Sequence, residues 1–463
     1  MQKKIGYLTL LFFALFYFTT SSGINCSNDG SHFALASAIY YHQSPEIKPF
    51  FHYVQKSDYA VKDGIIYSDR LPGNAFLMLP FLAYSNLLKL AGNNYLGKRF
   101  EADVVAISFL PNICGLIGLV LLFFLYRKIG FDFNLAYIST VIYGVATLHW
   151  LESVHAFSHG PSMMFVLWAV YLAGSVKDVK KDQKQLYAIA GLIGFSTIIE
   201  LQNILFLFPI FLYTVVLIHP SGFLRFRSWV PVVGGCMAIA AFFLACLAFY
   251  NYLTFGEILL KSNTFNPHFP EEKSFGSALD GNLLLGLDKL LTNFANPIVY
   301  TNWRMGIGND TPGIFITSPV LFLSLFGYVT FFKKQKNIAI LFLLMIAISV
   351  AIAALHKTTL TRHIFTVTPL LYFPIIYCLH YLWNSGKLRV AGTSLAALLV
   401  FLSTARVAYV IYSYYGRAYL GLFRYHSEML FFLLFYVPLI TIVLLWTRKK
   451  MMQDNIFKKP LIS

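Results

Sequence analysis

Charged residues are scarce in this chain of 463 residues. Asp, Glu, Lys and Arg make up only 12% of it, whereas 57% of the residues are hydrophobic. A typical soluble domain is about 25% charged, because its surface faces water. The scarcity of charge therefore excludes a soluble globular protein and points to a membrane.

Cysteine is scarce as well. Of the five cysteines, only Cys26 falls outside the long apolar runs. The other four lie within such runs, at Cys114, Cys236, Cys246 and Cys378. This distribution indicates neither a disulfide framework nor a cysteine-based metal cluster.

Long runs without a charged residue recur along the whole chain. A helix that crosses a hydrocarbon core of about 30 Å needs about 17 to 25 residues, and most of these runs are long enough. Backbone polar groups cannot stay unpaired in lipid, so the runs must be helices. We predict one all-α polytopic transmembrane domain over residues 1–463 with about twelve transmembrane helices. The predicted spans are residues 5–24, 104–126, 133–151, 160–176, 185–199, 201–224, 228–256, 311–332, 337–355, 364–386, 390–416 and 429–447.

Basic residues gather on alternate short loops between these spans. Short cytoplasmic loops are enriched in Lys and Arg, so the pattern predicts that both termini are cytoplasmic. Two long segments, residues 25–103 and 257–310, are then extracytoplasmic. The net charge of +16 is explained by this orientation signal, and no nucleic-acid partner is predicted. The basic loops are residues 127–128, 177–184, 225–227, 333–336, 387–389 and 448–450.

Two apolar segments need a separate interpretation. Residues 71–88 are uncharged but contain two prolines, and a crossing here would turn every later basic loop outward. We therefore predict a juxtamembrane helix that lies in the outer leaflet without crossing. The N-terminal run has the alternative of a cleaved signal peptide, although it lacks a clear small-x-small cleavage site.

A series of short motifs then follows in a fixed order. They are residues 29–36 (Asp-Gly-Ser-His-Phe-Ala-Leu-Ala), 67–73 (Tyr-Ser-Asp-Arg-Leu-Pro-Gly), 156–160 (Ala-Phe-Ser-His-Gly), Glu200, 251–256, 312–319, and Arg362-His363 ahead of 369–371. This order resembles the integral-membrane glycosyltransferases of the GT-C class. Within that class it is most similar to the protein-mannosyltransferases and the aminoarabinose-transferase-like bacterial proteins, over most of the chain.

The resemblance implies a reaction. A sugar, hexosyl or pentosyl, would pass from a polyprenyl-phosphate donor to an acceptor on the extracytoplasmic side of a prokaryotic inner membrane, with inversion at the anomeric carbon. The acceptor could be a lipid, a glycan or a protein. An acceptor hydroxyl benefits from a carboxylate that takes or orients its proton, and the leaving phosphate needs cationic stabilisation.

Asp29 is the candidate catalytic base. Its alternative role is an N-cap for a helix that starts near Ser31. A second carboxylate often follows directly in the family, but here that residue is Gly30. A divalent metal is therefore compatible with the resemblance but not required by it, and no metal ligands are predicted.

Six further residues are candidates for substrate binding: Asp69, Arg70, His159, Glu200, Arg362 and His363. Asp69 and Arg70 have the alternative of a solvated turn before Pro-Gly. Arg362 and His363 suit a phosphate at the outer mouth of a span, and their alternative is interfacial snorkelling. Arg304 and Lys357 are weaker phosphate candidates.

His155 and His159 are four residues apart and would share a helix face, as metal ligands sometimes do. Because no third ligand is suggested nearby, a polar loop pair is the favoured interpretation. Glu200 lies near the outer end of a span, where an ionised group is costly unless it is paired or hydrated. It is therefore either functional or a buried structural partner.

Two other functions compete with sugar transfer. A transporter or flippase for a lipid-linked or polar solute would be favoured by inverted repeats, and the two halves show no convincing self-similarity. A catalytically silent protein of the same fold is the other alternative, because fold does not fix function.

Overall fold

The structure is a computed structural model that describes residues 2–21, 23–24, 26–54, 57–90, 102–179, 181–214, 229–258, 262–268, 281–291, 313–356, 361–386, 388–423 and 445. Arg304 and Lys357 lie outside the described residues, as do residues 91–101 and most of the segment 257–310. The predicted span 429–447 is also outside them apart from Leu445.

The described chain is almost entirely helical, with one short hairpin. The first part forms α1 (Gln2–Thr19), α2 (Ser27–His42), η1 (Lys48–Tyr53), β1 (Tyr59–Lys62), β2 (Ile65–Ser68), α3 (Pro72–Leu90), α4 (Ala102–Lys128), α5 (Phe133–Ala146), α6 (Leu148–Glu152) and α7 (His159–Ala173). The rest forms α8 (Gln183–Ile199), η2 (Leu201–Phe206), α9 (Leu207–Leu212), α10 (Val230–Phe255), η5 (Ser262–Phe265), α12 (Leu283–Leu291), α13 (Ile314–Thr317), α14 (Leu321–Lys334), α15 (Lys336–Leu355), η8 (Thr361–Val367), α16 (Thr368–Tyr372), α17 (Ile375–Asn384) and α18 (Arg389–Phe423). The strands β1 and β2 pair antiparallel, with Tyr59 opposite Ser68.

Several of these helices are suited to a membrane. Within the described residues, 5 helices are long and apolar enough to cross one. They are Ala102–Lys128, Val230–Phe255, Lys336–Leu355, Thr361–Asn384 and Arg389–Ala408. Shorter apolar helices cover Ile5–Thr19, Phe133–Ala146, His159–Ala173 and Leu201–Leu212. These helices support an integral membrane protein, and the count of about twelve spans stays a prediction.

Proline explains two places where a predicted span is broken into shorter helices. The span predicted over residues 364–386 is built from η8, α16 and α17, which meet at Pro369 and Pro374. The span predicted over 311–332 divides at Pro319 into α13 and α14. Proline lacks the backbone N–H that a continuous helix needs, so each helix ends or restarts there.

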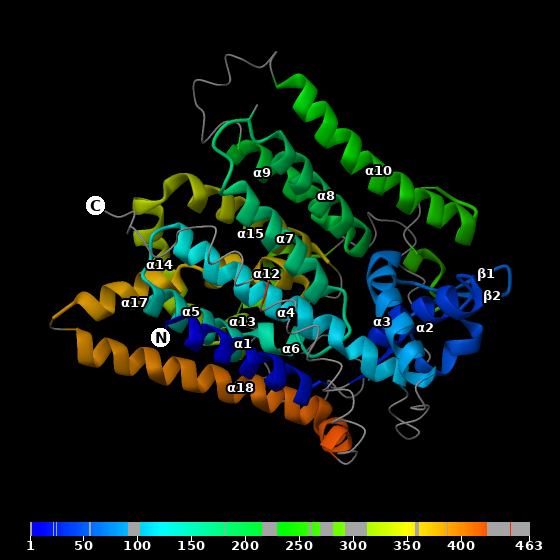
Figure 1. The fold of residues 1–463 in the computed structure, drawn as a ribbon, viewed down its shortest axis with the longest axis horizontal. Coiled ribbons are helices and arrows are strands. Elements are labelled where there is room, and N and C mark those ends of the chain that lie inside the picture. The colour runs from blue at the N-terminus through cyan, green and yellow to red at the C-terminus, as the bar shows by residue number, and fades with distance from the viewer. Residues whose placement is uncertain are drawn as a thin grey trace.

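The first long loop folds into a compact unit at one end of the bundle (Figure 1). Its helices α2 and α3 pack on each other, α2 packs on η1, and α3 packs on α4 and α8. The first turn of α3 approaches the end of α8 so closely that a Cβ on Gly73 would lie 2.6 Å from the carbonyl oxygen of Ile198. Asn74 then donates a hydrogen bond from Nδ2 to the carbonyl of Ala156, at 3.1 Å. These contacts hold the loop unit against the end of the bundle.

The helix α3 is the segment predicted over residues 71–88. It is not among the five described helices that are long and apolar enough to cross a membrane. Its position in the outer leaflet stays a prediction.

The bundle has its own core, in which polar groups join the helices. Asn112 on α4 donates from Nδ2 to Ser21 at 2.9 Å and to the carbonyl of Ser153 at 2.7 Å. Ser153 follows directly after α6. The end of α6 is therefore fixed to both α1 and α4.

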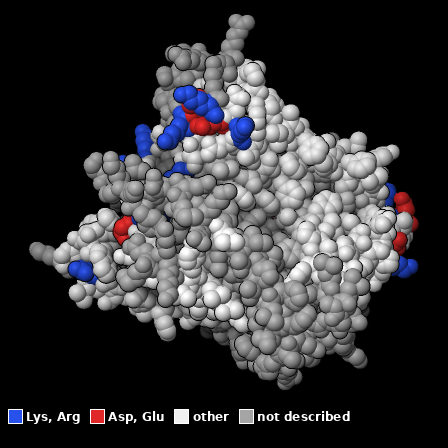
Figure 2. All heavy atoms as spheres, in the orientation of Figure 1, with Lys and Arg blue, Asp and Glu red and all other residues white. Residues whose placement is uncertain are grey.

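Charged side chains lie at the edges of the visible surface (Figure 2). One group lies over the hairpin of β1 and β2, another over the connection between α7 and α8, and the surface between them is largely uncharged. This distribution is expected when the uncharged band faces lipid.

The predicted orientation can be tested by cysteine labelling. In a background without the native cysteines, we expect an impermeant thiol reagent on intact cells to label His268→Cys but not Asp178→Cys. Both side chains are exposed, so a difference in labelling reports the side of the membrane. Labelling of Asp178→Cys without His268→Cys would contradict the orientation.

Candidate functional site

Asp29 lies in the first turn of α2, and its carboxylate caps that helix. The side chain is completely buried, and Oδ1 accepts hydrogen bonds from the backbone N–H of Cys26 at 2.9 Å and of Gly30 at 2.8 Å. The N-cap is Cys26, and Asp29 is the third residue of the helix. The alternative of Asp29 as the N-cap residue is therefore wrong, because α2 starts at Ser27 rather than near Ser31. The carboxylate still satisfies N-terminal donors, as in a capping box.

Gly30 is required by close packing. A Cβ at this position would lie 2.0 Å from the carbonyl oxygen of Tyr53 in η1. No carboxylate can therefore follow Asp29 unless η1 moves. Among the described residues, no group of three or more His, Cys, Asp or Glu side chains is arranged to hold a metal ion. The donor set around Asp29 does not fit a paired-carboxylate metal site, and we derive no step through a metal.

Asp69 and Arg70 form a buried network with Asp58. The Arg70 guanidinium is paired with Asp58, and its Nε lies 3.2 Å from Oδ1 of Asp69. Asn266 donates from Nδ2 to Oδ2 of Asp69 at 2.8 Å. Asp69 has only 1% of its surface exposed, so this is not a solvated turn. Sequence reasoning missed Asp58 and Asn266, because no local motif marks either residue.

The three charges of this network affect each other's ionisation. Burial acts to raise the pKa of Asp58, but the charge of Arg70 outweighs it and holds that pKa below its ordinary value. Burial and the charge of Asp58 raise the pKa of Asp69 to about 6, although the charge of Arg70 acts in the opposite direction. Arg70 is thus held charged mainly by Asp58, and Asp69 is the weaker acid.

Hydrogen bonds join this network to the start of α2. Ser27 Oγ donates to the carbonyl of Val54 at 2.5 Å and accepts from the backbone N–H of Asp58 at 2.6 Å. Ser31 and Ser68 share a hydrogen bond of 2.8 Å between their hydroxyls. The loop unit therefore presents Asp29 and the charged network as one rigid group.

His159 and Glu200 form a second pair, largely buried, at the ends of bundle helices. His159 begins α7, and its Nδ1 lies 2.5 Å from Oε1 of Glu200. Glu200 separates α8 from η2 with an extended backbone, which directs its carboxylate at the N-terminus of α7. The positive end of that helix dipole favours a negative group there. Sequence reasoning named both residues but did not predict that they pair.

Arg362 and His363 lie on η8, next to this pair. The guanidinium of Arg362 stacks over Phe157, 5.5 Å from the ring centroid. The ring of His363 lies 6.5 Å from that of His159. The charge of Arg362 also lowers the pKa of Asp58. Arg362 therefore lies between the bundle pair and the loop network, partly buried rather than snorkelling into solvent.

His155 and His159 do not share a helix face, which the spacing of four residues allowed, and His155 lies in the connection between α6 and α7, as the favoured interpretation of a loop pair predicts for it. The helix α6 ends at Glu152 and α7 begins at His159, so the spacing of four residues falls across a turn. The Nδ1 of His155 instead lies 2.6 Å from the carbonyl of Leu151.

Two further residues in this region were not named as candidates from the sequence. Glu152 ends α6, has 1% of its surface exposed, and its Oε2 has no hydrogen-bond partner within the described residues. The charges of His159 and Arg362 both act on it, while burial raises its pKa. A buried carboxylate oxygen without a partner is costly, which is a signature of a functional site. The sequence signal that could have found Glu152 is its position at the outer end of an apolar run.

His32 is the other missed residue. It lies one turn after Asp29 on α2, with 1% of its surface exposed, and neither ring nitrogen has a hydrogen-bond partner among the residues that the structure describes. Burial, together with the charges of Arg70 and His159, lowers the pKa of His32 to about 3. A neutral imidazole thus lies between the loop network and the bundle pair. The i, i+3 spacing from Asp29 was a usable signal.

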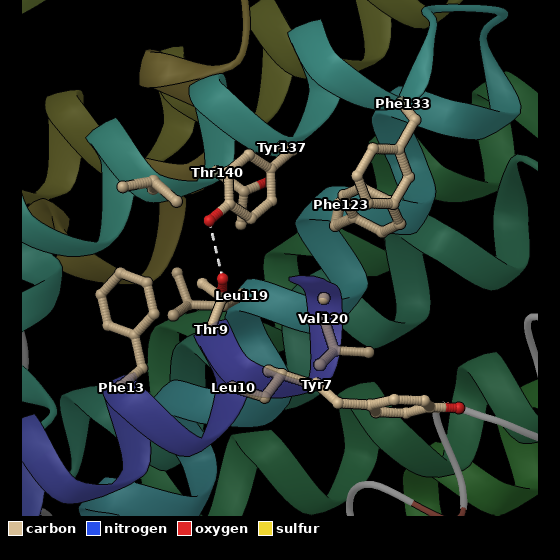
Figure 3. A pocket seen from close by; sticks show the side chains of 12 residues that line it. Tyr7, Thr9, Leu10, Phe13, Leu119, Val120, Phe123, Phe133, Tyr137 and Thr140 are labelled. Atoms are coloured by element: carbon tan, nitrogen blue, oxygen red, sulfur yellow. Dashed lines mark hydrogen bonds between the residues drawn. The ribbon is translucent and has the colours of Figure 1, made fainter. Parts of the chain in front are cut away.

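An apolar pocket lies elsewhere, between α1, α4 and α5 (Figure 3). Its volume is about 50 Å³, and its lining includes Phe13, Leu119 and Phe133. A hydrogen bond of 2.7 Å joins Thr9 to Tyr137 beside it. The cavity is too small and too apolar for a sugar, so it is not the candidate site.

Comparison with known proteins identifies the fold. No family model matches the sequence, and no curated protein matches it either. The structure matches the oligosaccharyltransferase AglB from Archaeoglobus fulgidus, solved with an inhibitory peptide and a dolichol-phosphate, at a TM-score of 0.50 and 11% identity over 88% of this chain and 56% of that one. The chain has a GT-C fold.

Two other solved structures are similar to this chain, and the first of them supports the same assignment of the fold. The A. fulgidus oligosaccharyltransferase with Zn and sulfate matches at a TM-score of 0.50 and 14% identity, over 86% of this chain and 52% of that one. ArnT from Cupriavidus metallidurans bound to undecaprenyl phosphate matches at a TM-score of 0.49 and 11% identity, over 89% and 75%. The chain spans just over half the length of the oligosaccharyltransferases. The resemblance to GT-C glycosyltransferases inferred from the order of motifs is confirmed at the level of the fold.

Proposed function

We propose that this GT-C protein transfers a sugar from a polyprenyl-phosphate donor to an acceptor on the extracytoplasmic face of a prokaryotic inner membrane. The observation that carries the proposal is the gathering of buried acids and cations at one end of the bundle. Asp29 and Arg70 come from the loop unit, whereas Glu152, His159 and Arg362 come from bundle helices. A fold shared with an enzyme solved with dolichol-phosphate supports a lipid-linked donor.

In the proposed reaction, the acid acts on the acceptor and the cation acts on the leaving phosphate. Asp29 accepts or orients the proton of the acceptor hydroxyl as its oxygen attacks the anomeric carbon. The bond from that carbon to the phosphate oxygen breaks, and polyprenyl phosphate leaves with the electron pair. Arg362 stabilises the charge that develops on this phosphate. Attack from the face opposite the phosphate inverts the anomeric configuration.

Arg362→Ala tests the phosphate side of this scheme. We expect kcat/KM for the donor to fall about 10- to 100-fold, the range for losing a charge-assisted hydrogen bond. The loss should appear mainly as weaker use of the donor, with KM for the acceptor unchanged. Arg389→Gln, at an exposed position outside the cluster, is the matched control. A kcat/KM for the donor that Arg362→Ala leaves unchanged would remove Arg362 from the phosphate site.

A vesicle experiment separates transfer from transport. Purified protein is reconstituted into liposomes that carry a polyprenyl-phosphate sugar with a radiolabel in the sugar. The proposal predicts that the label leaves the lipid and appears on an added acceptor. Label that crosses the bilayer while still attached to its lipid would identify a flippase instead.

A further inference from the structure

The pairing of His159 with Glu200 leaves one nitrogen of the imidazole for a ligand. Nδ1 of His159 lies 2.5 Å from the Glu200 carboxylate, and the described residues supply no hydrogen bond to Nε2. The side chain of His159 is 13% exposed, so a ligand at the membrane surface can reach it. Both residues lie outside the predicted spans 160–176, 185–199 and 201–224.

The carboxylate of Glu200 is held in place by several donors. Ser158 donates to Oε1 at 3.1 Å, and Ser162 and Thr366 donate to Oε2 at 3.3 Å and 3.2 Å. These hydroxyls come from the start of α7 and from η8, so two parts of the fold fix one carboxylate. A carboxylate on one ring nitrogen sets the tautomer and orientation of the ring and raises its basicity.

Charge around the ring favours its protonated form. Burial acts to lower the pKa of His159, but Glu200, which is both an ion pair and a hydrogen-bond partner, outweighs it and places that pKa above its ordinary value. Glu152 from α6 acts in the same direction, whereas Arg362 opposes it.

Two further histidines face this group from other elements. His363 on η8 and His32 on α2 both interact electrostatically with His159. His32 is neutral, because its pKa lies at about 3. The available donors at this place are therefore the Nε2–H of an imidazolium and a guanidinium, which together suit an anion with several oxygens.

We propose that His159, positioned by Glu200, donates its Nε2–H to an oxygen of the lipid phosphate, next to the guanidinium of Arg362. The inference rests on the proposed function and names the ligand that this part of the site takes, a phosphate ester at the end of a polyprenyl chain. Glu200 is a positioning residue, because it acts through His159. Affinity for polyprenyl phosphate then depends on the protonation of His159 and falls as the pH rises.

Binding of polyprenyl phosphate to the purified protein in nanodiscs, measured from pH 5.5 to 8.5, tests the inference. For the wild type we expect the affinity to fall about 10-fold or more as His159 loses its proton. The phosphate itself gains charge over this range, since its second pKa is about 6. That change strengthens binding as the pH rises, so it cannot imitate the expected fall.

Variants assign the effect to the pair. His159→Gln should bind weakly at low pH and lose the pH dependence that the wild type shows. Glu200→Gln should keep the dependence but shift its midpoint to lower pH, because the neutral amide no longer stabilises the imidazolium. The exposed residues His42 and Glu257 supply the matched controls, His42→Gln and Glu257→Gln, which should follow the wild-type curve.

The outcomes separate this inference from the proposed function. Binding by the wild type that does not weaken with rising pH overturns the inference, as does a His159→Gln curve that matches the wild type. Either result leaves Arg362 and the proposed function in place. A wild type that binds no polyprenyl phosphate at any pH overturns the proposed function itself.

Discussion

Asp29→Asn is expected to reduce sugar transfer about 100-fold or more, the scale for removing a positioned proton acceptor. The variant should fold normally. Asn keeps the Oδ1 that accepts from Cys26 and Gly30, so the cap of α2 is retained while the charge is lost. A reduced rate in a protein of unchanged stability would therefore separate the chemical role of Asp29 from its capping role.

Asp63→Asn is the matched control for this experiment. Asp63 lies in the exposed hairpin turn with a φ of 52°, and Asn adopts this left-handed conformation readily. It should retain wild-type transfer and thermal stability. Full activity of Asp29→Asn would instead leave Asp29 as a helix-capping residue and move the search for the base to Asp69 and Glu152.

Gly30→Ala is expected to destabilise the protein strongly. Its added methyl group would lie 2.0 Å from the carbonyl oxygen of Tyr53, so η1 must move away from α2. Overpacking at a rigid contact costs about 3 kcal/mol, and here the obstacle is backbone rather than a side chain that can rotate. We expect a clear fall in the thermal midpoint of unfolding in detergent, together with loss of transfer.

The control for Gly30→Ala is Gly191→Ala on α8. A Cβ at Gly191 meets nothing within 4 Å, and Ala is the better helix former. Gly191→Ala should therefore be neutral or slightly stabilising. If Gly30→Ala has the same thermal midpoint as Gly191→Ala, the packing of η1 against α2 is not as the structure describes it.

Much of the fold could be predicted from the sequence, because membrane helices are marked by long runs of apolar residues. Runs free of charge predicted apolar helices such as Lys336–Leu355, and α4 begins two residues before the predicted span 104–126. The breaks at Pro319 and Pro374 were harder to predict. A hydrophobic run does not reveal whether a proline ends a helix or is accommodated within it, as Pro111 is within α4.

Only part of the candidate site could be predicted from the sequence. Asp29, Arg70, Glu200 and Arg362 were named from short motifs, but their partners depend on packing between distant segments. Glu200 meets His159 across a separation of 41 residues, and Asp69 meets Asn266 across 197. Such pairs follow from how helices dock, and no local pattern encodes them.

Glu152 shows why composition alone misses a candidate site residue. In the sequence it is one of several acids in outer loops, marked only by its place at the outer end of an apolar run. In the fold it is buried beside two cations with a carboxylate oxygen that no described residue satisfies. Burial, rather than residue type, distinguishes it from a solvated acid.

The central claim is that this cluster breaks the bond between a sugar and a polyprenyl phosphate. Mass spectrometry of the lipid products tests it most directly, with purified wild type and Asp29→Asn incubated with polyprenyl-phosphate sugars and candidate acceptors. Sugar transfer predicts that the wild type releases polyprenyl phosphate in amounts equal to the glycosylated acceptor, and that Asp29→Asn releases about 100-fold less. Equal release by the two proteins, or donors that stay intact with every acceptor, would contradict it.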